Sequence, residues 1–284
     1  MKNALLILSC LINLGCKQET RKNTFKIEID SSSKQEVVHK KSRQVEKVKE
    51  EEIVKIEKLF DPKSLDTLLY FKDSLLVSLK NTDSLYIPDH YFESKFLDSL
   101  IAINDNDYEK ELEIEKYLLK LNEDFAKRDS LGLHLKIKNG GWKLISSNVD
   151  VYQLNIFEYY FEKYGFYAIR TQWGEGNGYK LINENDGKEL NLFGRPYFSN
   201  KGNYLISVNV DIEAGYSRNG FQLFKNNNGH LKEIGFYEPL GWGPSVAKWV
   251  NDSTVIFKNE TVEFKDGLMN NIYFYSKLNI NNID

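Results

Sequence analysis

The second half of the chain alternates short apolar runs with turn residues, and Tyr179–Val210 shows this pattern best. Asn185-Asp186-Gly187 and Asn200-Lys201-Gly202 separate its runs, and glycine supplies the positive φ that tight hairpin turns need. In the last run, every second residue from Tyr204 to Val210 is apolar, which is the period of a half-buried strand. The pattern predicts an antiparallel meander.

The meander pattern recurs along the chain. The aligned segments are Tyr179–Gly187 with Phe221–Gly229, and Phe161–Ile169 with Phe198–Ile206 and Trp249–Phe257. A further hairpin is predicted at Leu133–Ile145, around Asn139-Gly140-Gly141. Repeats of about 40 to 45 residues with several strands each are typical of propeller blades.

One ten-residue stretch carries a family resemblance. Tyr197–Ile206 resembles the F-S-x-D-G-x-x-[LI] turn of WD-type and TolB-like β-propeller repeats, with Asn200-Lys201 where that family usually has Pro-Asp. The resemblance implies β-blades in the C-terminal half, but only about three copies fit, and propellers typically need about four or more. Two architectures remain open, an open fragment capped by another element and a twisted antiparallel sheet, and the second is favoured.

The region before the repeats has helical spacing. Asp61-Pro62 and Pro88-Asp89 are typical helix starts, each followed by an apolar stripe, and Asp107–Lys127 is the clearest helix pattern. We therefore predict an α+β fold. Its parts are a helical segment at residues 59–130 and an antiparallel β-repeat domain at residues 131–284, with the helices packed on an edge or face of the sheet.

The N-terminus has the layout of a secretory signal. A short apolar run follows Lys2 and ends at Leu14-Gly15-Cys16, and it is too short for a membrane span. The end of the run resembles a bacterial lipobox, which implies cleavage after residue 15 and lipidation of Cys16. Cys10 has the better local match but leaves too short an apolar run, and an ordinary secreted protein or an uncleaved anchor are the alternatives. Residues 16–58 are polar and predict a largely disordered tether.

Composition limits the classes of partner and of catalytic chemistry that we expect. Cys10 lies in the signal and Cys16 directly follows it, so the folded part has no cysteine. The chain after the tether has more acidic than basic residues, so we expect no nucleic-acid partner. The four histidines are far apart in sequence, and no motif indicates a catalytic residue, a metal site or a cofactor. The expected partners are the membrane, through the lipid anchor, and a protein or glycan of the bacterial cell envelope, on the periplasmic or surface side.

Strand parity indicates where a binding site would lie. If the strands run up and down in sequence, the tight turns fall at one end and the longer connections at the other. The longer connections carry aromatic and charged residues suited to recognition, and these are the candidate binding residues: Trp173, Glu175, Arg195, Asp211, Glu213, Tyr216, Arg218 and Trp242. For Trp242, an exposed ring and a buried loop plug are equally compatible with its setting.

Three functions remain open. The first is a non-catalytic, membrane-tethered binding module that uses the long-loop end. The second is a hydrolase in which Glu175, Asp211 and Glu213 supply paired carboxylates. The third is an inhibitor or immunity-type protein whose acidic face binds a basic toxin or lysozyme.

Lipidation at Cys16 is directly testable. Cys16→Ala removes the thiol that would carry the lipid, so the variant should leave the membrane fraction or accumulate as an unprocessed precursor. Fractionation and mass measurement of the protein read out both effects. Unchanged processing and membrane association would contradict the assignment, and Cys10→Ala would then be tested.

Overall fold

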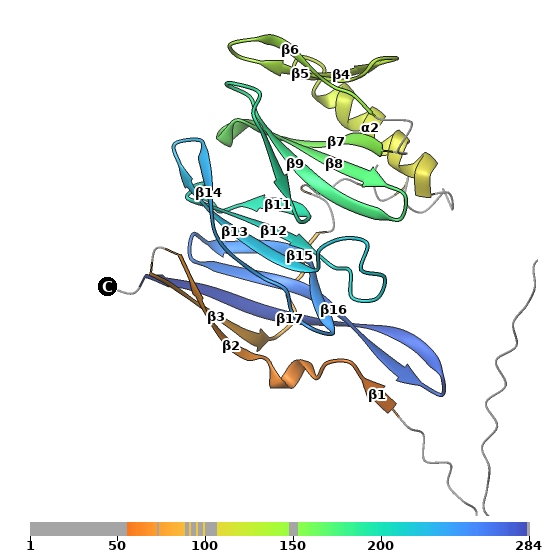
Figure 1. The fold of residues 1–284 in the computed structure, drawn as a ribbon, viewed down its shortest axis with the longest axis vertical. Helices are drawn as coiled ribbons and strands as arrows, with labels where there is room; N and C mark the ends of the chain where they lie inside the picture. Colours follow the sequence, from red (N-terminus) through yellow and green to blue (C-terminus); the bar gives the residue numbers. More distant parts are fainter. Residues whose placement is uncertain are drawn as a thin grey trace, which may run out of the picture. The chain divides into compact units, whose positions relative to one another are not determined.

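The computed structural model describes residues 56–72, 74–88, 91, 95, 99, 107–147 and 153–282 of the 284-residue chain. They belong to a compact unit, Glu52–Asp284, whose ribbon is shown in Figure 1. The predicted signal, Cys16 and nearly all of the tether lie outside the described residues. Within the described residues, no helix is both long and apolar enough to cross a membrane.

Four antiparallel sheets make up this unit. The first sheet contains β4 (Ala126–Asp129), β5 (Gly132–Ile137) and β6 (Gly141–Ile145), and the second contains β7 (Gln153–Phe161), β8 (Phe166–Trp173), β9 (Gly176–Asn183) and β10 (Glu189–Leu192). The third contains β11 (Arg195–Phe198), β12 (Tyr204–Asn209), β13 (Gly220–Asn227) and β14 (His230–Tyr237). The fourth joins β15 (Trp242–Asn251), β16 (Thr254–Lys265) and β17 (Leu268–Asn282) to β1 (Ile56–Lys58), β2 (Asp66–Phe71) and β3 (Leu75–Thr82).

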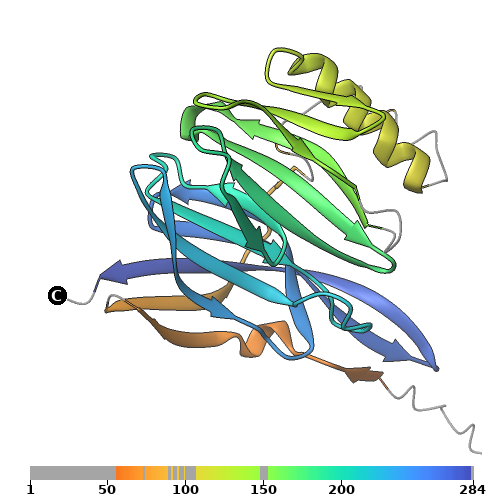
Figure 2. The same ribbon diagram turned by 45° about the horizontal axis from the view of Figure 1, so that its top comes forward.

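The sheets pack face to face in chain order, as Figures 1 and 2 show. One hydrophobic cluster lies between the first and second sheets and includes Leu135 and Ile169. A second joins the second and third sheets, and a third joins the third and fourth sheets around Phe221 and Phe257. The central strands of the two middle sheets are therefore buried on both faces.

Burial on both faces explains the strand sequences and corrects one expectation. Along β8, Phe166 and Ala168 pack toward the third sheet, while Tyr167 and Ile169 pack toward the first. Strands that are buried on both faces have continuous apolar sequences and not alternating ones. The half-buried strand expected at Tyr204–Val210 is instead buried on both faces, since Ser207 is fully buried.

The predicted α+β fold class is wrong, because the described residues are mostly β with one α-helix. Asp61 does cap a helix by accepting from the Lys63 N–H, but that 3-10 helix, η1, covers only Pro62–Ser64. The leucines from Leu68 to Leu79 lie in β2 and β3, and β3 pairs with the C-terminal strand β17. A partner almost 200 residues away decides this structure, and local spacing cannot reveal it.

The other two predicted helices fared differently. Most of the one starting at Pro88-Asp89 lies outside the described residues. The Asp107–Lys127 pattern corresponds to α2 (Asp107–Leu121), so that helix is confirmed, although it ends earlier than predicted. Its last predicted residues belong to β4, which pairs with β5.

The segments that align in sequence occupy equivalent places in successive sheets. Phe161–Ile169, Phe198–Ile206 and Trp249–Phe257 each span the first turn of a meander and the strand that follows it. Tyr179–Gly187 and Phe221–Gly229 each contain the third strand and its turn. No hydrophobic cluster of the described residues joins the first sheet to the fourth, so the stack is not closed into a ring there.

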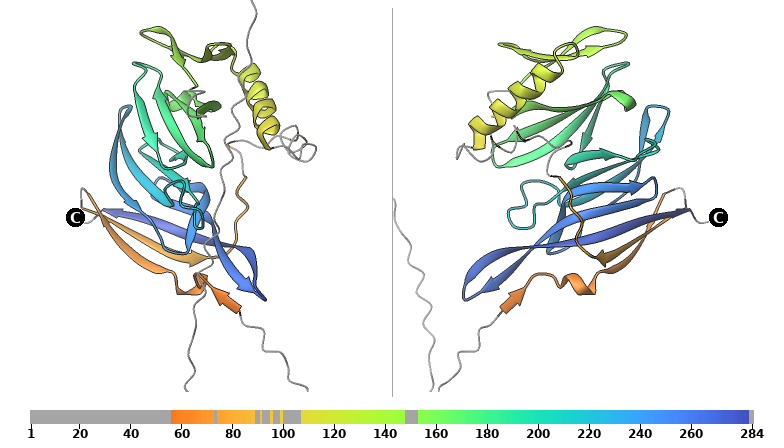
Figure 3. Two further views of the ribbon diagram at one scale, coloured as in Figure 1. Left: turned by 45° about the vertical axis from the view of Figure 1, so that its right-hand side comes forward. Right: turned by 180° about the vertical axis from the view of Figure 1, so that it is seen from behind.

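Helix α2 is fixed by a buried carboxylate and lies along β7 (Figure 3). Glu115 is 2% exposed and accepts from the Phe157 N–H at 2.6 Å, beside a bulge in the β7–β8 pairing. It also accepts from Arg128 of β4 at 2.7 and 2.6 Å. One side chain thus connects the helix to two sheets.

Removing this carboxylate should destabilise the fold. Glu115→Ala leaves the buried Phe157 N–H without its acceptor and the partly buried Arg128 with only the Asn155 carbonyl, and we expect a loss of about 2–4 kcal/mol in the free energy of unfolding, measured in urea. Glu113→Ala is the matched control, because Glu113 lies on the same helix, is half exposed and pairs with the exposed Lys116. It should change stability by less than about 0.5 kcal/mol. Equal losses for the two variants would refute this role of Glu115.

Candidate functional site

The connections between strands gather at two ends of the stack. At one end the tight turns bond to one another: Lys201 N–H donates to Asp252 at 2.8 Å, and the Asn226 side chain donates to the Gly202 carbonyl at 2.9 Å. At the other end the long loop at residues 210–219 bonds to β9 and to the connection after β14. Its Ser217 bonds to Asn177, and its Arg218 to Glu238.

A cleft of about 510 Å³ opens at the long-loop end, between β9, β10 and the loop at residues 210–219. Its aromatic lining is Trp173, Phe193 and Tyr216, and its polar lining is Asn177, Asn191, Ser217, Arg218 and Gln222. Small-molecule sites typically have about 300–1,000 Å³ and combine aromatic walls with a few polar groups. This cleft has that size and composition.

The indole of Trp173 packs against two glycines of β9, the strand that pairs with β8. It ends β8 and pairs with Gly176 across a two-residue turn whose first residue, Gly174, has a φ of 49°. A Cβ on Gly176 would lie 2.6 Å from the indole nitrogen, and one on Gly178 would lie 3.0 Å from the far edge of the ring. The indole therefore lies along β9 where side chains are missing, and the side chain is still 40% exposed.

The second aromatic wall, Tyr216, lies on a loop that is tied down on both sides of it. The carboxylate of Asp211 accepts from the N–H of Gly215 at 2.8 Å and of Ser217 at 2.6 Å. The Ser217 hydroxyl donates to the Asn177 carbonyl at 2.8 Å and accepts from the Asn177 N–H at 2.9 Å. The backbone that carries Tyr216 is thus held against β9, while its side chain is 55% exposed.

Arg218 lines the cleft and forms an ion pair with Glu238. Its guanidinium donates to both carboxylate oxygens of Glu238, at 2.8 and 2.9 Å, and lies 3.9 Å from the ring centroid of Phe193. The hydrogen bond from Arg218 lowers the pKa of Glu238, and the same bond raises the pKa of Arg218. Both groups are therefore charged at neutral pH, and their charges offset each other.

The eight candidate residues from the sequence are not all brought together. Trp173, Tyr216 and Arg218 line the cleft, and Asp211 braces its loop. Glu175 and Glu213 are exposed but are not part of the lining.

Trp242 and Arg195 lie away from this cleft. Trp242 is 1% exposed and packs against Phe60 and Phe274, so the buried alternative applies and the residue is part of the core. The placement of Trp242 among binding residues is therefore corrected, because its ring has no surface to offer a partner.

Arg195 belongs to a buried ionic cluster between the second and third sheets. It lies 3.3 Å from Glu158, which also lies 3.2 Å from Arg170, and Arg170 bonds to Glu111 of α2. Tyr179 donates to Glu158 at 2.8 Å, and burial raises the pKa of the Tyr179 hydroxyl. The cluster balances two arginines with two glutamates, which suits a structural role.

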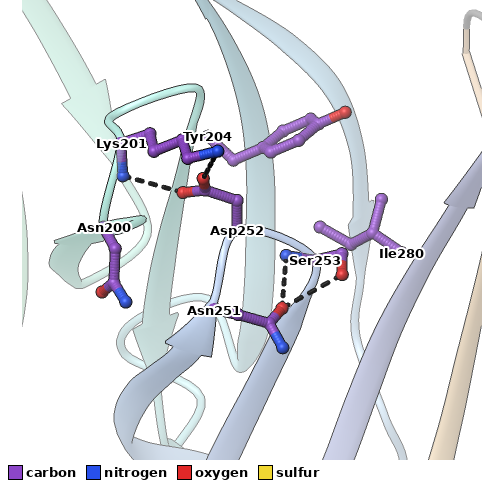
Figure 4. A pocket seen from close by; sticks show the side chains of 7 residues that line it. All are labelled: Asn200, Lys201, Tyr204, Asn251, Asp252, Ser253 and Ile280. Atoms are coloured by element: carbon purple, nitrogen blue, oxygen red, sulfur yellow. Dashed lines mark hydrogen bonds and ion pairs between the residues drawn. The ribbon is translucent and has the colours of Figure 1, made fainter.

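A second cleft, of about 450 Å³, lies at the tight-turn end between the third and fourth sheets (Figure 4). Its polar groups mostly bond to one another: Lys201 to Asp252, and Asn251 to Ser253 at 2.8 Å. Its single aromatic residue, Tyr204, faces Trp249. This cleft offers a ligand fewer open groups than the one at Trp173.

Sequence reasoning missed Asn177, Asn191, Phe193 and Gln222 as cleft residues. The sequence does contain one signal for the site. Gly176 and Gly178 are two residues apart, so they leave the same face of the strand without side chains beside Trp173. Only Gly174 and Glu175 form the turn, and both glycines that follow lie in β9.

Comparisons with protein-family models, curated proteins and solved structures find no match for this chain. Among the described residues, no group of three or more His, Cys, Asp or Glu side chains is arranged to hold a metal ion. The function must therefore be argued from the cleft itself.

The packing of the Trp173 indole against Gly178 can be tested without a ligand. In Gly178→Ala, the new Cβ would lie 3.0 and 3.2 Å from ring atoms of Trp173, so the indole must shift. We expect the indole N–H resonance of Trp173 to move in NMR spectra, while those of Trp242 and Trp249 stay in place. Gly140→Ala is the control, since its Cβ would meet nothing closer than 3.7 Å, and it should leave the Trp173 resonance unchanged. An unmoved Trp173 resonance in Gly178→Ala would show that the ring does not rest on this strand.

Proposed function

We propose that this protein is a non-catalytic binding module of the bacterial cell envelope, tethered to a membrane through a lipid on Cys16. Its ligand or partner binds in the cleft lined by Trp173, Tyr216 and Arg218. The polar residues between Cys16 and the folded unit serve as the tether. They keep the cleft at a distance from the membrane that a partner in the envelope can reach.

This proposal rests on one observation, the packing of the Trp173 indole against Gly176 and Gly178. Two glycines in an otherwise well-filled strand lose packing, and here they leave room for an indole that remains 40% exposed. A large apolar ring held at the surface in one position loses little conformational freedom on binding. Trp, Tyr and Arg are also the residues most enriched in binding hot spots, and all three line this cleft.

The paired carboxylates of the hydrolase alternative do not meet in this cleft. Glu175, Asp211 and Glu213 are all outside its lining, and the Asp211 carboxylate is occupied by two backbone N–H groups. General acid–base chemistry needs carboxylates within hydrogen-bond reach of the bound substrate. The binding function therefore has the stronger support at this site.

Substitutions of residues that line the cleft should show whether binding takes place in the cleft or elsewhere on the surface. Trp173→Ala and Arg218→Ala should each weaken capture of the envelope component by about 1–2 kcal/mol or more, because each removes a candidate hot spot. The measurement is the affinity of the full chain for material from envelope extracts, with urea unfolding to show that each variant is folded. Trp242→Ala is not used, since it would disrupt the core.

Trp142→Ala is the matched control, because Trp142 is also 40% exposed but lies on β6 of the first sheet. Lys201→Ala and His230→Ala probe the tight-turn end. All three should leave capture unchanged. If these variants lost binding and the lining variants kept it, the site assignment would be wrong, and turnover of a glycan or peptide by the purified protein would refute the non-catalytic function.

A further inference from the structure

We propose that the cleft at Trp173 binds an uncharged carbohydrate, with a sugar ring lying on the indole and its hydroxyl groups bonded to the side-chain amides of the lining. This inference rests on the proposed function of the cleft as a binding site. It adds the chemical class of the ligand, which follows from the shape, the polarity and the charge of the lining.

The shape of the aromatic surface suits a sugar ring. Trp173 lies lengthwise along β9, with its pyrrole side at Gly176 and its benzene side at Gly178, and the residue remains 40% exposed where it lines the cleft. A pyranose has a face formed by C–H groups that packs on an aromatic ring, while its hydroxyls project at the edge. Tyr216 adds a second exposed aromatic side chain in the same cleft.

The polar lining matches hydroxyl groups. A hydroxyl both donates and accepts hydrogen bonds, and so does a carboxamide. The lining places Asn177 and Asn191 beside the aromatic residues. Within the described part of the chain, no recorded hydrogen bond engages either side-chain amide, whereas the amide of Gln222 is occupied by Phe193 and Glu233. Asn177 and Asn191 therefore supply the groups that orient the sugar.

The charge of the lining argues against an ionic ligand. Arg218 is the single charged residue of the lining, and it is held by both oxygens of Glu238 and packed over Phe193 and Phe236. An anion would have to displace Glu238 from a two-bond ion pair, and a cation would find no lining carboxylate. An uncharged, hydroxyl-rich ligand meets no such obstacle.

The size and form of the site favour a carbohydrate over a protein surface. A concave site of about 510 Å³ suits a short saccharide or the end of a longer glycan. A protein partner would bury about 800 Å² of this end and would make use of Leu240, which is 91% exposed in the adjacent connection and lies outside the lining. Leu240 therefore distinguishes the two kinds of partner experimentally.

The test is calorimetric titration of the full chain with soluble oligosaccharides. The neutral probes are oligomers of glucose, galactose, mannose and N-acetylglucosamine, and the acidic probes are oligomers of uronic acids. We expect a neutral oligomer to bind with an affinity that is the same in low and high salt, because no unpaired charge takes part. Acidic oligomers should bind no more tightly than neutral ones.

Three variants make the test specific to the cleft. Trp173→Ala should weaken binding of the neutral oligomer by about tenfold or more, as for a hot-spot residue. Gly178→Ala should weaken it as well, through displacement of the indole. Trp142→Ala and Leu240→Ala are controls that should retain the affinity of the unchanged protein.

The outcomes separate this inference from the proposed function. Absence of binding by every neutral oligomer, salt-sensitive binding, or undiminished binding by Trp173→Ala would each overturn the carbohydrate inference. If an envelope protein binds instead and depends on both Trp173 and Leu240, the carbohydrate inference falls and the binding function stands. If neither saccharides nor envelope material depend on the cleft, both are refuted.

Discussion

Burial of the central strands of the two middle sheets on both faces is the constraint on which the rest of this structure depends. The second and third sheets each contribute to two hydrophobic clusters, so their central strands, such as β8 and β12, leave no polar face for water. Every polar group in these layers must then find a partner inside the protein, because an unpaired buried group costs about 1–3 kcal/mol. The polar architecture follows from this requirement.

Buried carboxylates meet the requirement where the layers join. Glu115 satisfies a bulged N–H of β7 and an arginine of β4, and Glu158 lies between Arg170 and Arg195. Glu184, at the turn after β9, bonds to Lys138 of the turn between β5 and β6 and to Tyr160 of β7. These carboxylates bridge elements that are distant in the sequence, so they fix how the layers are placed on one another.

The cleft uses the same rigid layers for a different purpose. The second sheet holds Trp173 on the strand that carries Gly176 and Gly178, and the loop from the third sheet holds Tyr216 and Arg218. Asp211 and Ser217 fix that loop to itself and to β9. Since the supporting groups are bonded within the protein, the exposed rings are positioned before any ligand arrives, which lowers the entropy cost of binding.

The sequence by itself determined the local elements whose signals are short-range. It predicted the hairpin at Leu133–Ile145, the helix that begins at Asp107, and the turns at Asn185–Gly187 and Asn200–Gly202, because glycine, turn residues and apolar spacing act within a few residues. It also aligned the strands of successive sheets and placed Trp173, Tyr216 and Arg218 together among its candidates.

Tertiary structure alone decided the remainder. Leu65–Leu79 has an apolar spacing that fits a helix, but β3 is a strand because β17 offers it a complete row of partners. Trp242 is a core residue because the rings of Phe60 and Phe274 pack on it, and Arg195 is drawn into the Glu158 cluster by the packing of β11 on the second sheet. In each case the deciding neighbour is far away in the chain, and a local pattern contains no information about which distant surface will cover it.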